Sequence, residues 1–296
     1  MSLTTGDFRS KITTQTLAEK KQKGERITAL TAYDYASARL VDEAGVDVIL
    51  VGDSLAQTML GYENTLPVTV EEMLHHTKAV RRGVRRAFLI ADMPFGSYHV
   101  SCKETLGHAA RFLKEAGAEA VKIEGGEKRI ELIEKILDAE IPVCGHIGLT
   151  PQSVHRMGGY KVQGKTLKAI EQLMRDATAL DRAGVALLVL EGIPREVAAM
   201  ITQEVAVPTI GIGAGPECDG QILVFHDLVG LTFTPPAKFV RRYADVGTVI
   251  SDAVRGYCED VKSGGYPADS ESYHLPKDTQ SALETIAAHR STLTKA

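Results

Sequence analysis

Four acidic residues in this sequence each follow a short, mostly apolar run. The runs cover residues 48–51, 88–91, 121–123 and 187–190, and the acids after them are Asp53, Asp92, Glu124 and Glu191. Continuous apolar runs are typical of parallel strands whose two faces are both covered. In a parallel (β/α) barrel, the carboxyl ends of the strands form the face that carries the chemistry. An active site built from these acids is therefore the leading hypothesis.

Three of the acids, Asp53, Asp92 and Glu124, follow successive runs. In a barrel they would lie on neighbouring strands, which are spaced about 4.8 Å apart. Carboxylates that close repel one another, and either protonation or a bound cation relieves the repulsion. A cluster of carboxylate oxygens favours Mg²⁺ or Mn²⁺ over zinc. We therefore predict a divalent-metal site, against the alternative that each acid only caps the helix after its strand.

Lys122 stands two residues before Glu124, so both side chains are expected on the same face of one strand. An interior Lys122 could bind an anionic substrate, act as a Schiff-base amine if its pKa were depressed, or form an internal salt bridge. Glu191 lies across the barrel and could move protons, or could be an acid at a helix N-terminus ahead of Pro194. His146 ends a further apolar run and is expected to be structural, or a donor to a ligand, rather than a metal ligand.

Alternating strand and helix patterns must position these residues. Strands are predicted at residues 26–32, 46–51, 87–91, 118–123, 141–146, 185–190 and 207–213, with an eighth at 222–224 or 228–231. Helices are predicted at residues 37–44, 69–83, 103–116, 127–139, 167–183, 194–205 and 237–262. Eight such units in about 240 residues favour an α/β fold with a closed (β/α)₈ TIM barrel over an open doubly wound sheet.

The two ends of the chain and one connection complete the predicted architecture. The spacing of Thr16 and Glu19 is typical of a capping box and predicts a short N-terminal helix that closes the bottom of the barrel, and Thr69 with Glu72 repeats this spacing. The connection at 147–165 is long and has no clear period, and such loops are usually functional or disordered. We assign residues 1–265 to one barrel domain and 266–296 to a C-terminal extension with a modest helix at 279–289.

Composition excludes several classes of protein. The 296 residues are 44% hydrophobic and carry a formal charge of −4. The sequence has no basic patch interleaved with aromatic residues and no Trp, so nothing suggests a nucleic-acid or membrane surface. No apolar run approaches the roughly 20 residues that span a bilayer, and the first 15 residues lack the apolar segment of a secretory signal. The widely spaced Cys102, Cys144, Cys218 and Cys258 indicate reduced thiols. We therefore expect a cytoplasmic protein.

Longer stretches carry a family resemblance that extends from about residue 14 to residue 267. They are TAYDY (31–35), DEAGVDVILVGDSL (42–55), TLPVT (65–69), GHIGLTPQSV (145–154), GGYKVQGKT (158–166), IGIGAG (210–215) and DGQILVFHD (219–227). Together these stretches resemble the ketopantoate hydroxymethyltransferase family. The resemblance implies a (β/α)₈ barrel related to the phosphoenolpyruvate mutase and isocitrate lyase group.

The resemblance also implies a reaction. A hydroxymethyl group passes from 5,10-methylenetetrahydrofolate to 3-methyl-2-oxobutanoate through a metal-stabilised enolate, which gives 2-dehydropantoate in pantothenate and coenzyme A biosynthesis. By resemblance, one Mg²⁺ per subunit is held directly or through water by Asp53, Asp92 and Glu124. The oxo acid is contacted by Asp53, Ser54, Asp92 and Lys122, and Glu191 is the base.

Some properties are left open by the resemblance. It indicates no folate-contacting residues, although the segment 147–165 is a candidate wall or lid for the folate. Bacterial members are often decamers, so a homo-oligomer is expected. The alternatives are another Mg²⁺-dependent C–C lyase or mutase of the same barrel group acting on a different 2-oxo acid, a Schiff-base aldolase using Lys122, and a non-catalytic assembly protein.

Overall fold

A closed parallel barrel, in the strand order β1 to β8, forms the core of the computed structural model, which describes residues 10–293. The strands are β1 (Ile27–Thr31), β2 (Val48–Val51), β3 (Phe88–Asp92), β4 (Ala120–Glu124), β5 (Val143–Gly148), β6 (Leu187–Glu191), β7 (Thr209–Ile212) and β8 (Gly220–Leu223). Strand β8 pairs with β1 in parallel and closes the barrel. The predicted (β/α)₈ architecture is confirmed, and the eighth strand occupies the first of its two predicted positions. The second position, 228–231, was wrong because its residues lie in and after a short helix.

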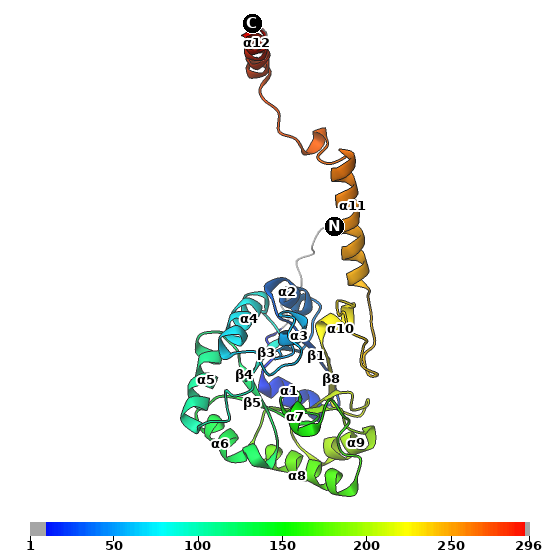
Figure 1. Cartoon of the computed structure of the whole chain (residues 1–296). Coiled ribbons are helices and arrows are strands. Elements are labelled where there is room, and N and C mark those ends of the chain that lie inside the picture. The colour runs from blue at the N-terminus through cyan, green and yellow to red at the C-terminus, as the bar shows by residue number, and fades with distance from the viewer. Residues whose placement is uncertain (1–9, 294–296) are drawn as a thin grey trace. The chain divides into compact units, whose positions relative to one another are not determined.

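Helices surround these strands, and Figure 1 shows α4, α5, α6, α8 and α9 as an outer ring. The α-helices are α1 (Thr14–Gln22), α2 (Tyr35–Glu43), α3 (Leu55–Thr58), α4 (Val70–Gly83), α5 (Cys102–Lys114), α6 (Ile130–Asp138), α7 (Val154–Met157), α8 (Leu167–Ala183), α9 (Arg195–Glu204), α10 (Phe225–Val229), α11 (Val246–Ser263) and α12 (Lys277–Leu293). Short 3₁₀ helices are η1 (Glu127–Arg129), η2 (Pro151–Ser153) and η3 (Asp269–Glu271). The long connection at 147–165 therefore contains η2 and α7 and is ordered.

Side-chain caps set where the helices begin. At α4, the Glu72 amide donates to Thr69 Oγ1 at 3.2 Å and the Thr69 amide donates to Glu72 Oε2 at 2.7 Å, which confirms that capping box. The N-terminal helix differs from the prediction. The prediction had Thr16 as the capping residue and Glu19 as its partner. In the structure Thr13 is the capping residue and the Thr16 hydroxyl is its partner, so the helix begins earlier, at Thr14.

The inside of the barrel is an apolar layer with a polar layer above it. Alternate strand residues form one buried cluster: Ile27, Ala29, Val48, Leu50, Phe88, Ile90, Ala120, Cys144, Leu187, Val189, Ile210 and Ile222. Ile12 and Leu17 belong to the same cluster, so α1 closes the amino-terminal end of the barrel as predicted. Because side chains alternate along a strand, the next interior positions on β3 to β6 carry Asp92, Lys122, Glu124, His146 and Glu191.

The C-terminal region departs from the prediction. The helix predicted at 237–262 begins only at Val246, because the Asp245 side chain caps that position and the Tyr243 amide donates to Leu228 O at 2.8 Å. Residues up to Ala244 form one compact unit and residues from Asp245 form a second, so α11 is not part of the barrel unit. The domain assignment of 1–265 and 266–296 remains a prediction. The predicted C-terminal helix is present as the longer α12.

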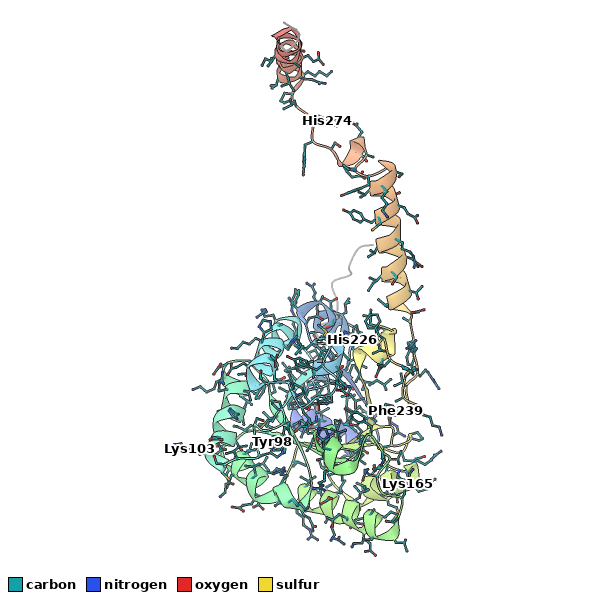
Figure 2. The ribbon with its side chains drawn as sticks, in the orientation of Figure 1. Tyr98, Lys103, Lys165, His226, Phe239 and His274 are labelled. Carbon is teal, nitrogen blue, oxygen red and sulfur yellow. The ribbon has the colours of Figure 1, made fainter. Side chains whose placement is uncertain are left out.

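Membrane spans and cysteine oxidation were the subject of two further predictions. Over residues 10–293, no helix is both long and apolar enough to cross a bilayer. All four cysteines are free thiols. Figure 2 shows the side chains on the ribbon.

Candidate active site

Asp53, Asp92 and Lys122 meet at the carboxyl ends of β2, β3 and β4. Asp92 Oδ1 lies 3.1 Å from Lys122 Nζ, and Asp92 Oδ2 accepts a hydrogen bond from the Asp53 amide at 2.9 Å. Both acids and the lysine are at most 5% exposed, as is Glu124 two residues further along β4. The structure therefore brings all four of these predicted site residues to one rim of the barrel.

A glycine leaves room for this arrangement. A Cβ atom on Gly52 would lie 2.9 Å from Ser54 Oγ and 3.6 Å from Asp92 Oδ2. A contact of 2.9 Å is too short for a carbon atom, so any side chain here would displace the serine hydroxyl. The glycine that ends the apolar run of β2 thus keeps backbone, rather than a side chain, beside the acids.

Gln152, in η2, connects the acids and was missed by the sequence reasoning. Its side-chain amide donates to Asp53 Oδ2 at 2.9 Å and to Met93 O at 3.0 Å, and its backbone amide donates to Glu124 Oε2 at 3.1 Å. Its oxygen accepts from the Tyr98 hydroxyl at 2.6 Å. Tyr98, labelled in Figure 2, lies on the connection between β3 and α5. Gln152 therefore holds two predicted metal ligands from a segment whose sequence shows only a proline turn.

His146 bridges the acid cluster and Glu191. Its Nδ1 lies 3.4 Å from Glu124 Oε1 and 3.2 Å from Lys122 Nζ, and its Nε2 lies 3.2 Å from Glu191 Oε2. When the ring is neutral, Nδ1 can accept from Lys122; when it is protonated, Nδ1 faces Glu124. Glu191 is more accessible than the other acids, with 18% of its side chain exposed. The structure thus places His146 between the predicted metal group and the predicted base.

Burial and mutual repulsion perturb these groups. Burial, with the charges of Asp92 and Glu124, raises the pKa of Asp53 well above its usual value. Burial also raises the pKa of Asp92, although Lys122 opposes the shift. Burial alone would lower the pKa of Lys122, but the surrounding carboxylates outweigh it and raise the pKa. A Schiff-base amine needs a lowered pKa, so the surroundings of Lys122 argue against the aldolase alternative.

The histidine is the second cation of the site. Burial and the charge of Lys122 act to lower the pKa of His146, but Glu124 and Glu191 outweigh them and raise it to about 9. The protonated ring is therefore favoured at neutral pH.

These residues fit a hard divalent cation, although they do not form a finished coordination sphere. Within residues 10–293, no three His, Cys, Asp or Glu side chains are arranged to hold a metal ion. Asp92 Oδ1 and Glu124 Oε1 are buried, and they lie 3.1 Å from Lys122 Nζ and 3.4 Å from His146 Nδ1, respectively. Buried carboxylate oxygens need a donor or a cation beside them, a role that a divalent ion can share with these two side chains. Mg²⁺ usually keeps several waters and needs only one or two carboxylates, so the metal role of the three acids remains a reasonable prediction.

Ser54 lies beside the acids with its own partner. Its hydroxyl is 2.8 Å from the hydroxyl of Tyr33, which is fully buried. Tyr160, in the long connection, has a pKa raised by burial and by the charges of Asp53, Glu191 and Glu124. The same connection contributes Gln152 to the acids, and its role as a wall or lid for the folate stays a prediction.

Several solved structures share this architecture. A phosphonopyruvate hydrolase described as a complex with oxalate and Mg²⁺ has a TM-score of 0.56 and 15% identity, covering 95% of this chain and 97% of its own. A 2,3-dimethylmalate lyase, described as a member of the phosphoenolpyruvate mutase/isocitrate lyase superfamily, has a TM-score of 0.54 and 17% identity, covering 95% and 98%. At such identities the likeness shows the fold alone. The chain thus shares the fold of these (β/α)₈ barrels and carries a buried acidic cluster at the carboxyl ends of its strands.

Sequence relatives make the assignment more specific. The model of the ketopantoate hydroxymethyltransferase family matches residues 11–269. The 3-methyl-2-oxobutanoate hydroxymethyltransferase of Koribacter versatilis (strain Ellin345) is 72% identical over 295 residues, covering 100% of both chains. That of Thermoanaerobacter sp. (strain X514) is 53% identical over 267 residues, covering 90% of this chain and 97% of the relative. The chain belongs to the ketopantoate hydroxymethyltransferase family, and the resemblance drawn from its motifs is confirmed.

Proposed function

We propose that this chain carries out the reaction of its family. It transfers a hydroxymethyl group from 5,10-methylenetetrahydrofolate to 3-methyl-2-oxobutanoate, which gives 2-dehydropantoate in pantothenate biosynthesis. The observation that carries the mechanism is the convergence of three buried carboxylates and Lys122 at one rim, with Glu191 beyond His146. No observation favours a different 2-oxo acid or a lyase reaction.

The proposed metal site uses Asp53, Asp92 and Glu124, which would hold one Mg²⁺ directly or through water. When bound, Mg²⁺ supplies Lewis-acid stabilisation of the negative charge that develops on the substrate's keto oxygen. Gln152 keeps two of these carboxylates oriented through its hydrogen bonds. The burial of the three carboxylates and their convergence at one rim of the barrel support this role.

Substrate binding is assigned to the same rim. Lys122 offsets the negative charge of the oxo acid's carboxylate, because the surrounding acids keep the lysine protonated. The Ser54 hydroxyl, oriented by Tyr33, supplies a hydrogen bond to the substrate. Asp53 and Asp92 contact the oxo acid through the cation that they hold.

Glu191 is the proposed base that removes the C3 proton of the oxo acid. It stands apart from the three acids proposed to bind the metal and is more exposed than they are, although its Oε2 lies 3.2 Å from His146 Nε2, and this position suits a group that accepts a proton from the substrate. Water first adds to the methylene carbon of the folate and the two C–N bonds break, which gives tetrahydrofolate and a one-carbon unit at the oxidation level of formaldehyde. The carbon nucleophile then adds to the carbonyl carbon of that unit, and its oxygen takes up a proton to become the new hydroxyl group. His146 connects the acids proposed to bind the metal with the proposed base, because it contacts both Glu124 and Glu191.

The division of roles is tested with Glu124→Gln and Glu191→Gln. Glu124→Gln is expected to weaken Mg²⁺ binding at least about tenfold, since it removes a charge from the metal group. Glu191→Gln is expected to leave Mg²⁺ binding near normal and to lower kcat on the order of 10²–10⁴-fold, the usual effect of losing a base. Isothermal titration and steady-state turnover measure the two effects. Glu131→Gln, at an exposed position of α6, is the control; equal loss of metal binding in both site variants would contradict the assignment.

Assembly and location are also proposed rather than observed. A homo-oligomer, with the decamer of bacterial family members as the expected size, follows from the family. A cytoplasmic location is supported by the four free, widely spaced cysteines. Light scattering coupled to size-exclusion chromatography, and cell fractionation, test the two proposals, and a monomer or an exported protein would refute them.

A further inference from the structure

A cavity of about 420 Å³ opens beside Glu124. Its walls come from the residues after β4, the long connection after β5, and the first half of α8. The volume lies within the range of roughly 300–1,000 Å³ that is typical of small-molecule sites. Because Glu124 belongs both to this cavity and to the buried acids, a ligand in the cavity reaches the reacting centre.

Three cations line the cavity: Lys128, Arg129 and Arg156. In the part of the chain that the structure describes, none of the three forms an ion pair with a carboxylate, whereas the surface residues Arg111 and Arg195 each do. An arginine or lysine without a partner at the wall of a cavity is available for an anionic ligand. The three cations therefore favour an anionic ligand in this cavity.

Two acids that line the same cavity, Glu124 and Asp176, accept hydrogen bonds from amides of the protein. Glu124 Oε2 accepts from the Gln152 amide at 3.1 Å. Asp176 Oδ1 accepts from the Glu127 amide at 2.9 Å and from Gln172 Nε2 at 3.0 Å. These hydrogen bonds orient the carboxylates toward neutral amides, and within residues 10–293 neither acid forms an ion pair with any of the three cations.

Arg129 is held in place within the wall. Its guanidinium lies 5.2 Å from the centroid of the Tyr98 ring, a cation–π distance. Gly125 has a φ of 119°, and a Cβ atom there would lie 2.9 Å from Arg129 Cγ. Both the left-handed backbone and the close approach require glycine. The site is therefore built around this arginine rather than lined by a loose surface side chain.

We propose that this cavity binds the folate co-substrate and that Arg129, Arg156 and Lys128 hold the carboxylates of its glutamyl tail. The inference rests on the proposed function, which requires a folate beside the acids. The oxo acid already has Lys122, and its single carboxylate does not need three further cations. The two tail carboxylates of a folate match a group of three cations without ion-pair partners in a cavity that also reaches Glu124.

The experiment compares two one-carbon donors. One is 5,10-methylenetetrahydrofolate, and the other is 5,10-methylenetetrahydropteroate, which lacks the glutamyl tail. Arg129→Gln and Arg156→Gln are each expected to raise the KM for the folate donor about tenfold, the effect of losing a charge-assisted hydrogen bond. The same variants are expected to show the wild-type KM with the pteroate donor and with the oxo acid. Arg129→Lys, which keeps the charge, is expected to lose less than Arg129→Gln.

The control is Arg182→Gln, an exposed arginine at the opposite end of α8, which is expected to change no KM. Circular dichroism checks that each variant is folded. An equal rise in KM with both donors, a rise for the oxo acid alone, or no change in any KM would overturn the proposal. If the wild-type enzyme shows no turnover with the folate, the proposed function itself fails. Titration of tetrahydrofolate into the Mg²⁺-loaded proteins then tests the cavity separately. Tighter binding to wild type than to Arg156→Gln is expected, and equal binding would refute the assignment of the cavity.

Discussion

Gln152 joins parts of the active site that come from different strands. It bonds Asp53 after β2, Glu124 on β4 and Met93 after β3, while Tyr98 holds its side-chain oxygen. The residue is 6% exposed, so bulk water does not compete for these bonds. We infer that Gln152 is a positioning residue that sets the orientation of two proposed metal ligands.

Replacing this residue tests the inference. Gln152→Ala is expected to weaken Mg²⁺ binding about tenfold, because hydrogen-bonding partners of ligating carboxylates contribute 10–100-fold to metal affinity. Isothermal titration measures the affinity independently of turnover. Gln221→Ala on β8, which loses one amide bond to Gly215 O, is the matched control and should bind Mg²⁺ normally. Unchanged affinity in Gln152→Ala would show that the acids are held by other contacts.

The residues that sequence reasoning found share one property. Asp53, Asp92, Glu124 and Glu191 each end an apolar strand, so a one-dimensional pattern places them on one rim. Gln152 and Tyr98 lie in connections without a period, and their contacts span 28 to 99 positions of the chain. No local pattern encodes such contacts. His146 was predicted to be structural or a donor to a ligand rather than a metal ligand, and the pattern could not show that it contacts Glu124 on one side and Glu191 on the other.

At the scale of elements, one buried aspartate ties the bottom of the barrel together. Asp47 Oδ2 accepts from the amide and hydroxyl of Thr28, both at 3.0 Å, and from Lys20 Nζ at 3.1 Å. Its Oδ1 accepts from Arg86 Nη2 at 3.1 Å. These contacts join α1, β1, β2 and the start of β3. Burial acts to raise the pKa of Asp47, but Thr28, Lys20 and Arg86 together lower it.

The sign of this shift gives a pH-dependent prediction. Because the folded-state pKa of Asp47 is lower than its ordinary value of 3.8, the ionised carboxylate stabilises the fold above that value, and the contribution is lost as the pH falls through the folded-state pKa. Asp47→Asn is therefore expected to reduce the free energy of unfolding by about 2 kcal/mol at pH 7, and by less below pH 3.8.

Urea unfolding of both proteins at pH 7 and at acid pH measures this difference. Glu43→Gln removes an exposed i,i+4 pair with Arg39 and should change the stability little. A difference between Asp47→Asn and wild type that grows on acidification would contradict the assignment.

Element types were easier to predict than element boundaries. The strands are buried on both faces, so their apolar runs mark them directly. The start of α1 depends on which of several hydroxyls caps it, and Thr13 does so rather than Thr16. The start of α11 depends on Asp245 and on the hydrogen bond that ties Tyr243 to Leu228. A single capping residue decides where a helix begins, and a periodic apolar pattern does not show which residue that is.

At the scale of the whole molecule, the chain separates into two compact units, and the second begins at Asp245. The described side chains after Gly265 are exposed, and the hydrogen bonds of that segment are local, such as those of Ala268 with Glu271 and Ser272. A chain ending at Gly265 is therefore expected to keep the thermal unfolding midpoint and the turnover of the full chain. Calorimetry and a steady-state assay measure both. A lower midpoint would mean that residues 266–296 belong to the folded core.

Helix α1 closes the amino-terminal end of the barrel, because Ile12 and Leu17 pack against the apolar layer. Ligands of the buried acids therefore enter from the carboxyl-terminal end. If the keto acid binds at the buried acids and the folate in the cavity beside Glu124, the folate would cover the path of the keto acid. We predict that the keto acid binds first and that its product leaves last, and product-inhibition kinetics check this order.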